Sequence, residues 1–202
     1  YKSFANPIEL VRIPEQQTST EFQPRNVGNG QLFGLELEFR KNLDFISPSL
    51  ENITLNGNFT YVESQIDMSN LELRARRRFE KTGESIEDTR VMAGQAPYLV
   101  NLGVSYGNAS RTLETGLFYN VKGPTLFIVG SGLYPDVYQV PFHSLNFTIN
   151  KKFGEKIVVD FSVNNILDDK MERVYRSYEA DDQPFDVFSP GISFGLGLNY
   201  TL

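Results

Sequence analysis

The chain has 202 residues, a formal net charge of −6 and a slightly negative mean hydropathy. Its acidic balance argues against nonspecific nucleic-acid binding, and the absence of cysteine excludes disulfides and thiolate metal sites. No run of about 18 apolar residues is present, which excludes a transmembrane helix. A membrane β-strand needs only about 9–11 residues, of which every second one is apolar.

Alternation of apolar and polar residues recurs along the chain and predicts about eight antiparallel strands. The first is expected from Tyr1 to Ile13, despite Pro7. The others are expected at residues 33–40, 53–61, 98–106, 113–121, 144–150, 157–164 and 191–202.

The last predicted strand, residues 191–202, alternates without a break over twelve residues. One face carries Ile192, Phe194, Leu196, Leu198, Tyr200 and Leu202, and the other carries small or polar residues. Strands of soluble sheets usually have about five or six residues. The length and the glycines at 195 and 197 therefore favour a long, tilted strand of a barrel.

The predicted connections alternate between short and long. Short ones lie near residues 42–50, 107–110 and 153–156, and long ones near 14–29, 70–94, 122–136 and 168–188. Outer-membrane barrels have short periplasmic turns and long extracellular loops. The pattern predicts an all-β, transmembrane, antiparallel up-and-down barrel whose last strand runs toward the periplasm. A soluble all-β domain is the alternative.

Several segments resemble the C-terminal barrel of TonB-dependent outer-membrane receptors, particularly the Bacteroidetes type. They are residues 34–38 (GLELE), 55–61 (LNGNFTY), 95–101 (QAPYLVN), 134–138 (YPDVY), 164–168 (NNILD) and 190–195 (PGISFG). The resemblance implies that residues 1–202 are about the last eight strands of a barrel of about 22 strands. It also implies an upstream plug domain and TonB box, and energised import of a scarce, bulky nutrient.

The resemblance implies further partners: the lipid bilayer and lipopolysaccharide, the TonB complex, the barrel assembly machinery and, in some relatives, a surface lipoprotein lid. Many outer-membrane barrels end in a Phe that the assembly machinery reads, whereas this chain ends in Leu202. The aromatic and apolar alternation is kept, so we expect the assembly signal in Phe194, Leu196, Leu198, Tyr200 and Leu202.

Charged residues at polar positions of the predicted strands are expected to face the lumen. They are Glu36, Glu38, Arg40, Glu114 and Asp160, and in a plugged barrel such groups pair with charges on the plug. A catalytic carboxylate pair is the weaker hypothesis.

The loops hold the candidate ligand-binding residues. Arg74, Arg76, Arg77 and Arg78 form either a patch for an anionic ligand or a salt-bridged loop, with a short helix over residues 71–79. Such a cluster equally suits lipopolysaccharide phosphates or a partner protein. Aromatics toward the long-loop side, suited to stacking on a ligand or to the interfacial girdle, are Phe118, Phe127, Tyr134 and Tyr138.

No catalytic group, cofactor or metal site is predicted. The single histidine, His143, is expected to face outward with Leu145, in the aromatic girdle. The last loop is rich in carboxylates, at Glu179, Asp181, Asp182 and Asp186, but lacks the glycine spacing of a calcium motif.

Four functions therefore remain open. The first is a TonB-dependent receptor and transporter for a siderophore, glycan, peptide or vitamin complex. The second is a complete small barrel of about eight strands that acts as an anchor or adhesin. An outer-membrane enzyme and a soluble carbohydrate-binding sandwich are less favoured.

Overall fold

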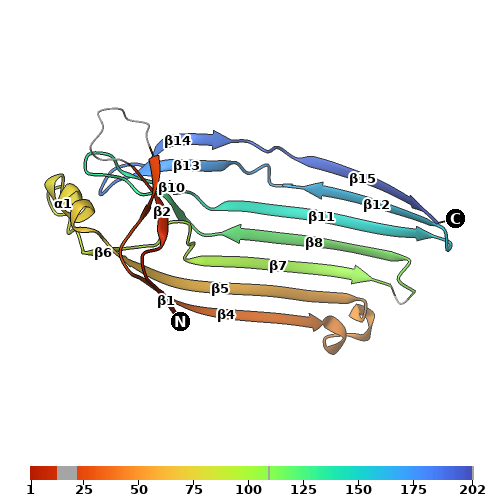
Figure 1. The fold of residues 1–202 in the computed structure, drawn as a ribbon. Helices are drawn as coiled ribbons and strands as arrows, with labels where there is room; N and C mark the ends of the chain where they lie inside the picture. The colour runs from red at the N-terminus through yellow and green to blue at the C-terminus, as the bar shows by residue number, and fades with distance from the viewer. Residues whose placement is uncertain (13–21, 109, 202) are drawn as a thin grey trace.

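The computed structural model describes residues 1–12, 22–108 and 110–201. In these residues the main sheet has nine antiparallel strands in the order β1-β4-β5-β7-β8-β11-β12-β15, with β6 paired to β5 (Figure 1). Their bounds are β1 Lys2–Phe4, β4 Gly30–Asn42, β5 Ile53–Asp67, β6 Thr89–Arg90, β7 Tyr98–Gly107, β8 Leu113–Lys122, β11 Phe142–Phe153, β12 Ile157–Asn164 and β15 Ser193–Tyr200.

Short connections lie at one end of this sheet and long ones at the other, as predicted (Figure 1). At the short end, β4 and β5 are joined through two 3₁₀ turns, η1 Leu43–Phe45 and η2 Pro48–Leu50. In the β7–β8 turn, the Asn108 side chain accepts hydrogen bonds from the backbone of Thr112 and Leu113. Gly154, with φ at 65°, allows the tight turn from β11 to β12. The C-terminal end of β15 lies at the same end of the sheet as these turns.

The opening stretch does not form the single strand that was predicted from Tyr1 to Ile13. β1 pairs with β4, whereas β2 (Ile8–Arg12) leaves the main sheet and pairs with β3 (Phe22–Asn26). The change of direction falls at Asn6, with φ at 50°, and at Pro7, which has no N–H to donate to a neighbouring strand. Residue 13 lies outside the described residues.

The long connections build a second body, which we call the head. It consists of the β2–β3 hairpin, the helix α1 (Asn70–Arg78), β6 and a four-stranded sheet, together with the residues that join them. The four-stranded sheet has the order β14-β13-β10-β9, with bounds β9 Thr125–Ile128, β10 Asp136–Gln139, β13 Met171–Arg176 and β14 Gln183–Phe188. A parallel bridge between Val11 and Val129 joins the hairpin to the residue that follows β9.

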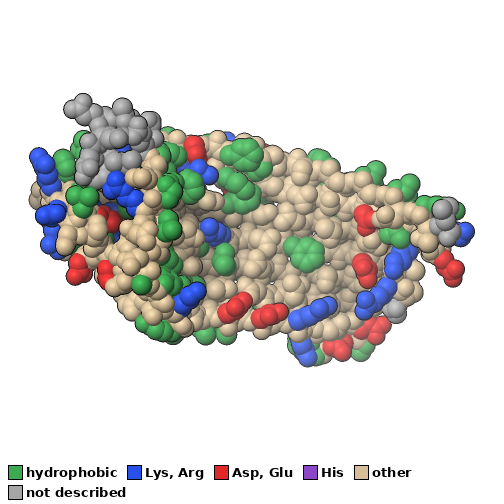
Figure 2. All heavy atoms as spheres, viewed as in Figure 1, with side chains coloured by type: hydrophobic (Ala, Val, Ile, Leu, Met, Phe, Trp, Pro, Cys, Tyr) green, Lys and Arg blue, Asp and Glu red, His purple; other side chains and the backbone are tan. Residues whose placement is uncertain are grey.

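The two faces of the main sheet differ in chemistry. We call one the apolar face; its large side chains are widely exposed, including Phe33, Leu35, Leu37, Phe39, Phe59, Leu102, Val104, Leu117, Phe161, Phe194, Leu196 and Leu198. We call the other the polar face; Asn, Ser, Thr and Gly dominate it, so Figure 2 shows a largely tan sheet with few green side chains. No helix in the described residues is long and apolar enough to cross a membrane.

The buried apolar residues lie in the head and at the strand ends next to it. They are Val27, Ile66, Ala96, Val121, Leu126, Ile128, Val129, Val137 and Val174. A water-soluble sheet buries its apolar face, but here that face is exposed along the long strands. The head therefore buries its apolar residues as a soluble protein does, whereas the long strands expose theirs.

Most of the predicted strands are present in the structure, but their ends are shifted. β4, β5 and β11 extend beyond the predicted 33–40, 53–61 and 144–150, because their added residues pair with neighbouring strands. The last strand is shorter than predicted. It pairs with β12 from Ser193 to Tyr200, after Gly191 turns the chain with φ at 69°. Leu202 lies outside the described residues.

Candidate ligand site and wall of the barrel

A buried ionic chain ties the parts of the head together. Arg90 Nη2 lies 2.6 Å from Glu9 Oε2, and Arg90 Nε lies 2.7 Å from Glu72 Oε1. The same Glu72 oxygen lies 3.2 Å from Arg76 Nε, and Arg76 Nη2 lies 2.7 Å from Asp136 Oδ1. The chain thus joins β2, α1, β6 and β10. Because all five side chains are less than one fifth exposed, solvent screens these ion pairs weakly.

The carboxylates outweigh burial in setting the charge of these arginines. Desolvation by itself would lower the pKa of Arg76, but Asp136 and Glu72 raise it above its ordinary value. At Arg90, desolvation would likewise lower the pKa, but Glu72 and Glu9 raise it above its ordinary value. Both guanidiniums stay charged, so the ionic chain acts as a fixed structural tie.

The four predicted loop arginines separate into two groups. Arg76 faces inward to the ionic chain. Arg74, Arg77 and Arg78 are exposed, and their spacing of three and four residues puts them on one face of α1. Arg74 donates to the backbone oxygen of Asn70, and the Arg78 guanidinium lies 5.8 Å from the Phe79 ring. No ion pair with a described carboxylate is found for these three side chains.

A pocket of about 540 Å³ lies in the head and brings together part of the predicted ligand set. Arg76, Tyr134 and Tyr138 line it, whereas Arg74, Arg77 and Arg78 do not. The Arg12 guanidinium lies 3.3 Å from the centre of the Tyr134 ring, and the Arg176 guanidinium lies 4.9 Å from that of Tyr138. Burial, and then the nearby Asp136, raise the pKa of Tyr138, which keeps its hydroxyl protonated.

Lys81, Arg176 and Tyr178 also line this head pocket, and sequence reasoning missed them. Lys81 Nζ donates to Ser177 Oγ at 2.8 Å and to the Tyr178 backbone oxygen at 3.0 Å. Tyr178 in turn donates its hydroxyl to the Gly83 oxygen at 2.9 Å. The contacts span more than ninety residues of sequence and follow no local pattern, so only the tertiary structure reveals them.

The predicted lumen charges all lie on the polar face. Glu36, Glu38 and Arg40 follow one another along β4, and Glu36 accepts a hydrogen bond from Asn58. Asp160, on β12, accepts hydrogen bonds from Asn150 and Asn199. In the described part of the chain no ion pair joins these charges to one another.

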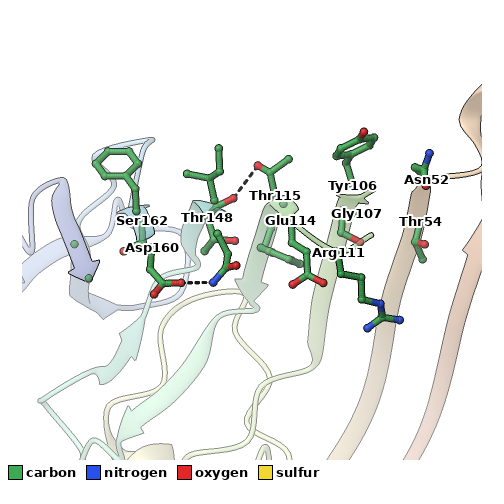
Figure 3. A pocket seen from close by; sticks show the side chains of 18 of the residues that line it. Asn52, Thr54, Tyr106, Gly107, Arg111, Glu114, Thr115, Thr148, Asp160 and Ser162 are labelled. Atoms are coloured by element: carbon green, nitrogen blue, oxygen red, sulfur yellow. Dashed lines mark hydrogen bonds between the residues drawn. The ribbon is translucent and has the colours of Figure 1, made fainter. Parts of the chain in front are cut away.

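A hollow of about 760 Å³ opens on the polar face near the short connections. Figure 3 shows Glu114, Arg111 and Asp160 pointing to one side of the sheet, and Tyr106 to the other. Arg40 lines the same hollow. Charged side chains of both signs therefore gather here, and no ion pair joins them within the described residues.

The structure also places His143 and the acidic residues of the last loop, which the sequence offered as weaker candidates. His143 lies on the apolar face, as its parity predicted, and its Nδ1 is 2.6 Å from the Tyr119 hydroxyl. In the last loop, Asp182 pairs with Arg176 and Asp186 with Arg173. The Asp182 pKa is lowered by hydrogen bonds from Arg176. No cluster of metal-binding side chains is present in the described residues.

The long antiparallel strands, the exposed apolar face and the connections sorted by length define an outer-membrane β-barrel wall. Residues 1–166 match the family described as "TonB dependent receptor-like, beta-barrel". The chain therefore belongs to the β-barrel domain of TonB-dependent receptors, a family of outer-membrane proteins. No curated protein matches the chain.

Two solved structures have a similar fold. One is described as the ferric citrate transporter FecA in the unliganded form, with 17% identity and a TM-score of 0.61 over 92% of this chain and 26% of that one. The other is the copper transporter OprC, with 15% identity and a TM-score of 0.54 over 89% of this chain and 24% of that one. The chain thus spans about a quarter of the length of each.

Proposed function

We propose that the chain forms the last part of the wall, and part of the extracellular mouth, of a TonB-dependent transporter that imports a scarce, bulky nutrient. The observation that carries the proposal is the charged polar face of a wall that belongs to this family. Charged groups on a barrel wall need water or an opposing surface. A plug inside the barrel would supply that surface at Glu36, Glu38, Arg40, Glu114 and Asp160.

In this proposal the head faces the outside and the short turns face the periplasm. The head pocket, with Arg76, Tyr134 and Tyr138, is then placed to meet a ligand before it enters the barrel. The exposed Arg74, Arg77 and Arg78 suit an anionic partner, such as lipopolysaccharide phosphate or a lipoprotein lid. Energy would come from the TonB complex through an upstream segment. The signal for the assembly machinery would be carried by Phe194, Leu196, Leu198, Tyr200 and Leu202.

The test uses the full-length protein in its own outer membrane. The small molecule that copurifies with it is identified by mass spectrometry, and uptake of the labelled molecule is measured with and without a protonophore. We expect uptake that the protonophore abolishes. Uptake that is insensitive to the protonophore would contradict energised transport. Failure of the full-length protein to bind or import any solute would favour an anchor or adhesin instead.

A further inference from the structure

A row of asparagine side chains crosses the polar face from strand to strand. Asn146 Nδ2 donates to Asn120 Oδ1, Asn120 to Asn101 at 2.7 Å, and Asn101 to Asn58. Asn58 then donates to Glu36 Oε1 at 2.6 Å. At the other end, the backbone N–H of Asn165 donates to Asn146 Oδ1 at 3.1 Å. The donors all point in the same direction, toward β4.

The row remains available to a ligand although its members bond to one another. A carboxamide has two N–H donors and two acceptor lone pairs. Within the row, Asn101 and Asn120 each use one donor and one acceptor, and both residues are exposed. Both lie near the head ends of β7 and β8, whereas Glu114 and Asp160, where the proposed plug would pack, lie toward the short connections. Neighbouring strands lie about 4.8 Å apart, so the row presents amide groups at this repeat. Strands in such barrels tilt by about 35–45°, so a row that runs across them is inclined along the barrel axis.

An aromatic ring lies beside the row. Phe118, between Glu114 and Lys122 on β8, is half-buried on the polar face and lines the hollow. A Cβ at Gly103 would lie 2.8 Å from its ring, and one at Gly116 would lie 2.6 Å away. The ring therefore rests on two glycines of the wall. Its register partner on β11 is Asn146, a member of the row.

We propose that the asparagine row and Phe118 form a contact strip for a neutral, hydroxyl-rich ligand, namely an oligosaccharide. Adjacent amide donors and acceptors match vicinal hydroxyls, and a ring that lies on the wall offers a stacking surface to the C–H face of a sugar. The row carries no charge apart from Glu36 at its end, so it provides nothing to neutralise a highly charged ligand. The inference rests on the proposed transport function and specifies its substrate class.

The experiment uses the full-length protein in detergent and saturation-transfer NMR. The probes are maltohexaose, xylohexaose and mannohexaose, with hexagalacturonate as a charged comparison. We expect binding of at least one neutral hexasaccharide, weakened about three- to tenfold by Phe118→Leu and by Asn120→Ala. The matched control is Phe39→Leu, because Phe39 also rests on a glycine, Gly57, but on the apolar face. Heat-modifiable gel mobility verifies that each variant is folded.

Binding of none of the neutral hexasaccharides would overturn the strip, as would binding of hexagalacturonate alone or unchanged affinity in the folded variants. If Phe118→Leu does not fold, Asn120→Ala decides the result. Protonophore-sensitive uptake of some other solute would then leave the transport proposal standing. Absence of any energised uptake would overturn both proposals.

Discussion

Arg90 lies between two carboxylates and is shielded from solvent, with 8% of its side chain exposed. Replacing one member of a buried ion pair leaves the others charged and without compensation. The chain from Glu9 to Asp136 is therefore more informative about stability than the exposed arginines of α1. These ties between distant segments position the lining of the head pocket.

Arg90→Met is expected to destabilise the head by about 3–5 kcal/mol, because Glu9 and Glu72 lose a shared cation. Hydrogen exchange of the full-length protein, measured over residues 70–93, reports the free energy of local opening. Arg78→Met is the matched control, since that side chain is exposed, and it should change stability by less than about 0.5 kcal/mol. Equal protection in the two variants would show that the ionic chain does not hold the head.

The facing of single residues on β15 leads to a second prediction. Leu198 is 72% exposed on the apolar face, and Asn199 is its neighbour on the polar face. Leu198→Arg should impair membrane insertion by about 2–4 kcal/mol if the residue lies near the midplane, whereas Asn199→Arg should have little effect. Folding titrations into lipid vesicles measure the difference. Similar insertion of both variants would contradict the assigned faces.

At the scale of elements, β15 is paired on one side only. It hydrogen bonds to β12, and no strand among the described residues pairs with its other edge. Its last residues hold the turn end of β12, since Tyr200 pairs with Ile157 and the Thr201 N–H donates to the Lys156 oxygen. An exposed strand edge requires either a partner strand or protection.

Deletion of residues 199–202 should abolish assembly, because it removes this pairing and the end of the apolar alternation together. Surface protein in whole cells and heat-modifiable mobility are the measurements. The control is Thr201→Ala, which preserves the backbone and the apolar face. Wild-type surface levels of the truncated protein would show that this segment carries no assembly information.

The sequence predicted strands well where one face is exposed to lipid and the other is polar. Such strands alternate residue by residue, so β4, β7, β11 and β12 were all found by period. The same method failed for residues 1–12, where the chain switches between two sheets at Asn6 and Pro7. It also missed the head sheet, whose strands are only four to six residues long and are interrupted by bulges in β10 and β13.

The candidate site was predicted in part for a similar reason. Arg76, Tyr134 and Tyr138 belong to conspicuous local clusters of sequence. Lys81 and Tyr178 do not, because their contact depends on two loops meeting across the head. The asparagine row was likewise visible only as lumen-facing polar positions. Its continuity depends on the register of five strands, which alternation alone does not fix.

At the scale of the whole molecule, two environments divide the chain. The head buries apolar residues and ion pairs as a water-soluble protein does, whereas the long strands expose an apolar face and keep asparagines and charges on the other. A barrel in a membrane explains this division, since lipid covers the apolar face and the polar face lines the lumen. The match of residues 1–166 to the TonB-dependent receptor barrel places this wall in that receptor family.

Site-directed spin labelling along β7 tests this division most directly, and these 202 residues contribute no cysteine of their own to the background. Single cysteines at residues 98–106 of the full-length protein are labelled in lipid vesicles, and collision with oxygen and with a water-soluble nickel reagent is measured. The account predicts a period of two, with oxygen contact highest at Val100, Leu102 and Val104 and lower at Asn101, Gly103 and Ser105. Loss of that period, or nickel contact highest at Leu102, would contradict it.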